Sequence, residues 1–100
     1  MDRKTYFEGI VQVSTTQEDI DNIEINMVEG NNHSVSDISV KSANVLDNLS
    51  DCKVVDLEVE VIIRIDEGTD PFFTVSNTEN WTCDEKSIVN SVEVELVYSK

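Results

Sequence analysis

The stretch VVDLEVEVIIRID, residues 54–66, decides the fold class of this chain. Its apolar residues alternate with polar ones, which is the period of a β-strand with one face in a core. The other face carries three acids in succession, Asp56, Glu58 and Glu60. We therefore predict a long strand here whose outer face is strongly negative.

The composition favours a mainly β domain. The chain has 15 Val and 9 Ile against 4 Leu and one Ala; Val and Ile pack well on a pleated sheet and lose rotamer freedom in a helix. No Pro- or Gly-rich linker divides the sequence, so we expect a single domain, 1–100. The prediction is a mainly β (α+β) fold: an antiparallel sheet or sandwich of about six strands with one or two short helices.

Alternating apolar residues mark the remaining strands. In the last of them, Val92, Val94, Leu96 and Tyr98 are expected on the inward face. The full set of predicted strands is 5–13, 22–28, 34–41, 54–66, 72–75 and 91–99.

Two segments have features of short helices. Residues 42–51 begin with Ser42 as a cap, and Val45, Leu46 and Leu49 follow at helical spacing. Residues 82–89 begin with Thr and Glu at the spacing of a capping box. The same spacing in residues 14–22 allows either a single helical turn or a solvated connection.

The charge restricts the partners. Twenty-one acids against seven bases leave a net charge of −14, so we expect no direct binding to nucleic acid, which requires clustered Lys and Arg. Binding to an anionic membrane surface is disfavoured for the same reason. The expected partner is a basic surface of another protein, and the alternative is an acidic domain whose charge only keeps it soluble.

Features of the sequence also indicate a location. The N-terminal residues contain no apolar run typical of a signal peptide, and no segment approaches the length of a membrane span. Cys52 and Cys83 are then expected as free thiols in a reducing compartment. We predict a cytoplasmic protein of the producing or infected cell.

No catalytic constellation is evident. The single histidine, His33, lies in a polar turn without a nucleophile nearby, and three scattered glycines do not form a phosphate-binding loop. The acids in 66–70 and 18–21 match no calcium loop. We predict no enzyme activity, no cofactor and no metal site.

The acids of the long strand have counterparts near the C-terminus, where Glu93 and Glu95 also face outward. If the two strands are neighbours in one sheet, like charges lie side by side and destabilise it. Two alternatives are that the acids only prevent aggregation of sheet edges, or that the strands are not neighbours. Trp81 is either a core anchor or an interface residue. The candidate partner-binding residues are Asp56, Glu58, Glu60, Asp66, Glu67, Asp70, Glu93, Glu95 and Trp81.

Three functions fit this surface. The first is a small acidic inhibitor or adaptor of a basic protein, such as a nuclease or another nucleic-acid-binding protein; in size and charge the chain is similar to phage anti-defence inhibitors and to immunity proteins of nuclease toxins. The second is a β-rich structural subunit of an oligomer or viral particle. This function would make the protein a homo-oligomer. The third is a peptide-holding module, because strand, short helix and long strand in 34–66 resemble the order in the export chaperone SecB.

Overall fold

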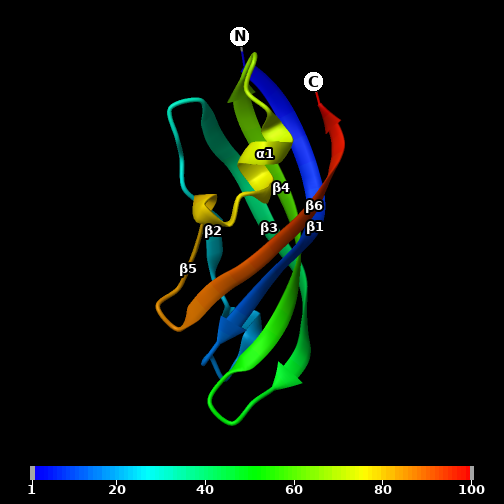
Figure 1. The fold of residues 1–100 in the computed structure, drawn as a ribbon. Coiled ribbons are helices and arrows are strands. Elements are labelled where there is room, and N and C mark those ends of the chain that lie inside the picture. Colours follow the sequence, from blue (N-terminus) through cyan, green and yellow to red (C-terminus); the bar gives the residue numbers. More distant parts are fainter. Residues whose placement is uncertain (1, 100) are drawn as a thin grey trace.

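The computed structural model describes residues 2–99, which form an elongated molecule of 48 × 22 × 18 Å. Four long antiparallel strands make one sheet in the order β3-β4-β1-β6, and two short strands make a second sheet, β2-β5 (Figure 1). The strands are β1 (Asp2–Thr15), β2 (Ile25–Met27), β3 (His33–Asn48), β4 (Lys53–Asp66), β5 (Trp81–Cys83) and β6 (Ser87–Ser99). The helical elements are α1 (Pro71–Ser76) and the 3-10 turns η1 (Ile20–Asn22) and η2 (Thr78–Asn80). The predicted mainly β, antiparallel fold class is thus confirmed.

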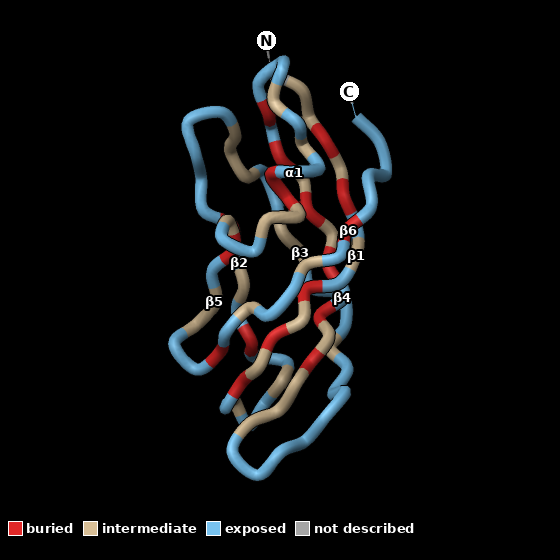
Figure 2. Tube along the Cα trace, in the orientation of Figure 1, coloured by how far each residue is buried: buried red, intermediate tan, exposed pale blue. Residues whose placement is uncertain are grey.

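The predicted long strand is β4, and it lies inside the sheet between β3 and β1. Every second residue of β4, from Val55 to Ile65, is completely buried, and Figure 2 shows the buried positions following β4 and β1. Each such side chain contributes roughly 1.5–3 kcal/mol relative to an exposed one. We call this side of the sheet the inner face and the opposite side the outer face.

A second layer covers the inner face. Met27 of β2, Trp81 of β5 and Val75 of α1 join the same hydrophobic core as the inward residues of β1 and β4. Trp81 is only 5% exposed, and its indole N–H donates a hydrogen bond to the Val75 carbonyl over 2.7 Å. This residue is a core anchor, so we exclude it from the candidate partner-binding surface.

The helix predicted for residues 42–51 is wrong, because β3 continues through this segment to Asn48. Its pairing with β4 is interrupted by bulges at Ser36, Lys41 and Leu46, five residues apart. Each bulge adds one residue to the strand, so the inward apolar positions are spaced three, two, three and two residues apart. That spacing fits neither a regular strand nor a helix. The inward positions are Val35, Ile38, Val40, Ala43 and Val45.

Local turn chemistry corrects two further predictions. Residues 72–75, predicted as a strand, lie in α1: Pro71 is the first helical residue, and the Asp70 carboxylate accepts hydrogen bonds from the N–H groups of Phe72 and Phe73. Residues 82–89, predicted as a helix, contain the end of β5, a turn and the start of β6. The predicted order of strand, helix and strand in 34–66 is therefore absent, and with it the resemblance to SecB.

The inward set predicted for the last strand holds only in part. Val94 is buried, but a bulge at Val97 shifts the register, so that Tyr98 lies opposite Tyr6 on the outer face. The two tyrosine rings stack there with centroids 4.1 Å apart. Leu96 pairs with the inward Phe7 yet stays 51% exposed. A shift by one residue turns a side chain to the opposite face of a sheet, which explains the error.

Both edges of the large sheet are irregular. The bulges interrupt β3, and α1 packs beside β6, the other edge strand. Such features obstruct edge-to-edge pairing with another sheet. Of the helices formed within residues 2–99, none is long and apolar enough to cross a membrane.

Gly9 gives a direct test of the β1–β6 contact. A Cβ atom at this position would collide with the Glu93 carbonyl oxygen and lie within 2.6 Å of Val94 Cα, both in the backbone. We expect Gly9→Ala to lower the free energy of unfolding by about 3 kcal/mol or more, at the upper end of overpacking effects. Urea denaturation measures this loss. The control Gly68→Ala adds a methyl group to open space at a φ of +93° and should cost only about 1–2 kcal/mol; equal losses in the two variants would contradict the close approach.

Asp84 gives a test at acid pH. Burial alone would raise the pKa of its carboxyl, but hydrogen bonds from Glu24 N–H, the Ser87 side chain and Lys86 N–H together lower it. A carboxyl whose pKa is lowered in the folded state stabilises the protein at pH values above its ordinary pKa of about 3.9. This stabilisation is lost as the pH falls through the folded-state pKa. We expect Asp84→Asn to cost about 1 kcal/mol at pH 7, with the difference from wild type shrinking below about pH 4. A difference that is constant from pH 7 to pH 2.5 in urea titrations would contradict this assignment.

Candidate functional site

The outer face of the large sheet carries the predicted acids of the long strand and of the last strand. Glu58 and Glu60 of β4 and Glu93 and Glu95 of β6 all lie there. The two strands are not neighbours, because β1 runs between them. The alternative that the two strands are not neighbours is therefore correct, and β4 and β6 do not place like charges directly side by side.

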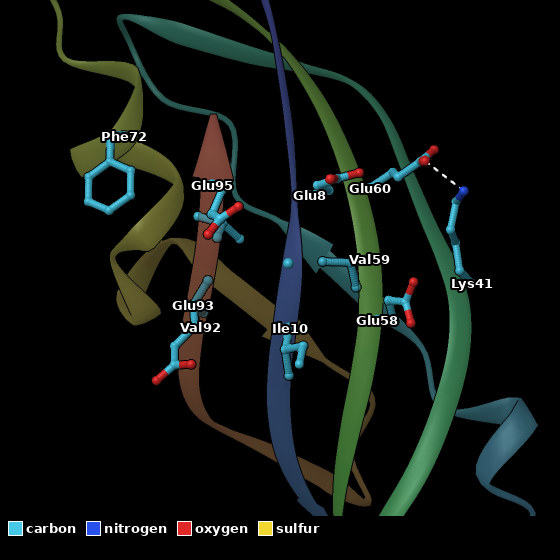
Figure 3. A pocket seen from close by; sticks show the side chains of 12 residues that line it. Glu8, Ile10, Lys41, Glu58, Val59, Glu60, Phe72, Val92, Glu93 and Glu95 are labelled. Atoms are coloured by element: carbon cyan, nitrogen blue, oxygen red, sulfur yellow. Dashed lines mark ion pairs between the residues drawn. The ribbon is translucent and has the colours of Figure 1, made fainter. Parts of the chain in front are cut away.

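A glutamate of β1 restores the crowding. Glu8 lies opposite Glu60 on one side and opposite Glu95 on the other, and neighbouring strands are about 4.8 Å apart. Figure 3 shows Glu8 between the other two carboxylates. We call Glu60, Glu8 and Glu95 the acidic row. The next cross-strand set is Glu58, Ile10 and Glu93.

Glu8 was absent from the candidate residues. The alternation of residues 5–13 places Phe7 and Val11 inward, and hence Glu8 outward. That signal was present in the sequence, but it did not indicate which strands lie beside β1. Only the pairing of β1 with both β4 and β6 shows that three carboxylates meet.

Little positive charge compensates these acids. The ion pair between Lys41 Nζ and Glu60 Oε1, at 2.7 Å, is the only one within residues 2–99. The hydrogen bond from Lys41 to Glu60, together with the Glu60 charge, raises the pKa of Lys41. Both side chains are about half exposed, so this pair contributes little to stability. Glu8 and Glu95 have no ion-pair partner among the described residues.

The acids line a shallow hollow of about 680 Å³. Its floor includes the acidic row and the neighbouring set of Glu58, Ile10 and Glu93. Ile10 is 39% exposed. Phe72 of α1 lies at one rim and Lys41 of β3 at the other, on either side of the carboxylates (Figure 3). A ligand in this hollow would therefore meet an exposed aromatic ring at one rim and carboxylates on the floor.

An apolar set borders the acidic row on its other side. Ile62, Tyr6 and Tyr98 lie opposite one another across β4, β1 and β6. Tyr98 is 43% exposed, and its hydrogen bond with Tyr6 raises its pKa. Lys4 Nζ lies 5.8 Å from the centroid of the Tyr6 ring. The aromatic residues and the acidic row on the outer face are thus only two residues apart along β1.

The other predicted acids differ in how close they lie to the glutamates of the outer face. Asp56 is on the outer face, where it accepts a hydrogen bond from Gln12 over 3.2 Å. Asp66 ends β4, six residues beyond Glu60, which corresponds to about 20 Å along a strand. Glu67 is exposed in the following turn, and Asp70 caps α1. The structure therefore joins Asp56 with the glutamates and separates Asp66, Glu67 and Asp70 from them.

The Cys83 thiol and the histidine have local structural contacts. Cys83 Sγ donates a hydrogen bond to the Ser87 carbonyl, and burial raises the pKa of this thiol. His33 Nε2 donates to the Val28 carbonyl over 2.8 Å, since a carbonyl only accepts. Within residues 2–99, no group of three His, Cys, Asp or Glu side chains is placed to hold a metal ion.

Comparison of this chain with known protein families, curated proteins and solved structures found no match. The functional assignment therefore depends on the chemistry of the outer face.

Crowding in the acidic row predicts a response to salt. Opposed like charges in a sheet cost up to about 1 kcal/mol per pair, and added salt screens exposed charges. We expect the melting temperature to rise by roughly 4–8 °C for each kcal/mol that is relieved as NaCl increases from about 0.02 to 0.3 M. Glu8→Gln should raise the melting temperature at low salt and reduce its salt dependence. If Glu8→Gln instead lowers the melting temperature, the three carboxylates do not repel one another significantly.

Proposed function

We propose that this protein is a small acidic binding protein that inhibits or adapts a basic protein through the outer face of its large sheet. The single observation that carries the proposal is the acidic row, in which Glu8 lies between Glu60 and Glu95 on an open sheet face. Like charges in these positions disfavour folding. A contribution to binding is a reason for a sequence to retain them.

Protection of sheet edges does not account for Glu8, Glu58 and Glu60, although Glu93 and Glu95 lie on the edge strand β6. Charged residues that prevent aggregation belong on edge strands, and the edge strands here are β3 and β6. Glu8 lies on β1, and Glu58 and Glu60 lie on β4, both inside the sheet. Solubility does not require this arrangement either, because a net charge of about 2–8 in magnitude suffices for a small domain.

Electrostatics select the class of partner. A net charge of −14 and a face with closely spaced carboxylates attract basic surfaces and accelerate their association. Proteins that bind nucleic acid present such surfaces, because they bind rows of phosphates. We propose a nuclease or another nucleic-acid-binding protein as the partner, with the outer face occupying its nucleic-acid site. Such an inhibitor acts in the cytoplasm of the producing or infected cell and binds neither nucleic acid nor membranes itself.

Reversing the charge of the acidic row tests the proposal. Glu8→Lys combined with Glu95→Lys changes no inward residue, turns the Glu60–Glu8 pair into an opposite-charge pair and keeps like charges opposite each other at positions 8 and 95. We expect unchanged or higher stability, and a loss of affinity for a basic partner of at least 100-fold, or about 3 kcal/mol. Association kinetics with a partner captured from the host, recorded as a function of salt, measure the effect.

A matched control separates the face from the net charge. Asp51→Lys combined with Glu79→Lys makes the same change of charge at exposed positions in the β3–β4 turn and in η2. This variant should lose less than tenfold in affinity, through weaker long-range attraction alone. Equal losses in the two double variants would show that net charge, and not the acidic row, determines binding.

A further inference from the structure

We propose that the partner segment docking on the outer face carries arginine, and that an arginine side chain stacks on the Tyr6–Tyr98 pair while its guanidinium binds the acidic row. This inference rests on the proposed function and specifies the partner further: it predicts selectivity for arginine over lysine. The outer face of the sheet carries no second layer from residues 2–99, since β2 and β5 join the core on the inner face.

Register brings the aromatic and acidic groups together. On β1, Tyr6 and Glu8 are two residues apart and face the same side, which separates them by about 6.6 Å along the strand. On β6, the bulge at Val97 turns Tyr98 to the side of Glu95. Without this bulge Tyr98 would face inward, so the bulge places the stacked rings on the same face as the acidic row.

Arginine matches this pair of groups better than lysine does. Its guanidinium is planar, stacks on aromatic rings and presents a fork of donors that suits carboxylates. Lysine carries a compact charge that is strongly hydrated. Its ammonium group therefore gains less binding energy from the tyrosine rings beside the acidic row. The position of Lys4 near the Tyr6 ring shows that this aromatic pair already accommodates a cation at one side. Tyr98 is 43% exposed and is the member of the pair on the edge strand.

Charge complementarity identifies the occupant. A second copy of this chain, placed face to face, would bring one acidic row against another. A phosphate backbone would be repelled in the same way. A basic segment of another protein is attracted, and the hollow between Phe72 and Lys41 suits a segment that projects from its own surface. An arginine-bearing loop or strand end meets both requirements.

Two peptides of equal charge provide the test. Both are twelve-residue Gly/Ser chains, one with four arginines and the other with four lysines, and calorimetry at 50 mM NaCl measures their affinities for the whole protein. For wild type we expect the arginine peptide to bind about threefold to tenfold more tightly than the lysine peptide. This ratio is the gain expected from one exposed cation–π contact together with a bidentate hydrogen-bonded pair to a carboxylate. Tyr98→Leu should reduce the ratio to about one, and Tyr98→Phe, which keeps the ring, should retain it. Thermal melting verifies that both variants fold.

The outcomes separate this inference from the proposed function. Glu8→Gln with Glu95→Gln should weaken both peptides, because it removes charge from the acidic row. Equal affinities of the two peptides for wild type, with that double variant still weakening both, would overturn arginine selectivity and leave the acidic face as the binding site. An arginine preference that survives in Tyr98→Leu would also overturn it, since the ring of Tyr98, the exposed member of the pair, would not be its cause. Failure of both peptides to bind would contradict the proposed function itself.

Discussion

The pairing of β1 with β4 on one side and β6 on the other is the constraint on which the rest of the structure depends. It places the first strand of the chain between the long strand and the last one. At Gly9 the backbone of β6 lies so close that a side chain has no room. This pairing aligns Phe7 and Val11 with the buried residues of β4, and it also places Glu8 between Glu60 and Glu95. The same strand pairing and register therefore produce both the core and the acidic row.

Bulges distribute side chains between the two faces. In β3, three bulges keep Val35, Ile38, Val40, Ala43 and Val45 on the inner face although the sequence departs from a regular alternation. In β6, the bulge at Val97 has the opposite effect on Tyr98, which it moves from the expected inner face to the outer face. Extra residues also increase the local twist of a strand. The irregular strands are the two edges of the sheet, where pairing with only one neighbour leaves room for them.

The outer face combines a cost for folding with features of a binding surface. Its carboxylates lie close together on the interior strands β1 and β4 and on the edge strand β6, with one lysine near them. Its aromatic pair lies one step away, and tyrosine is enriched among residues that contribute most to protein interfaces. Binding of cations would relieve the repulsion within the acidic row, so the energy that disfavours the isolated fold contributes to complex formation. This coupling connects the stability of the free protein with its proposed function.

The sequence by itself determined the mainly β class, the long strand and the outward direction of its acids. Strict alternation in residues 54–66 and the abundance of Val and Ile carry this information locally. The helix in 42–51 could not be excluded from the sequence, because bulges change the period of the apolar residues only through pairing with β4. Likewise, the short strand at 72–75 was wrong because Asp70 and Pro71 start a helix there. Only the tertiary structure decided that Glu8 belongs to the acidic row and that Tyr98 faces outward. Both depend on which strands are neighbours and in what register, and hydrogen bonds between distant segments set these relations.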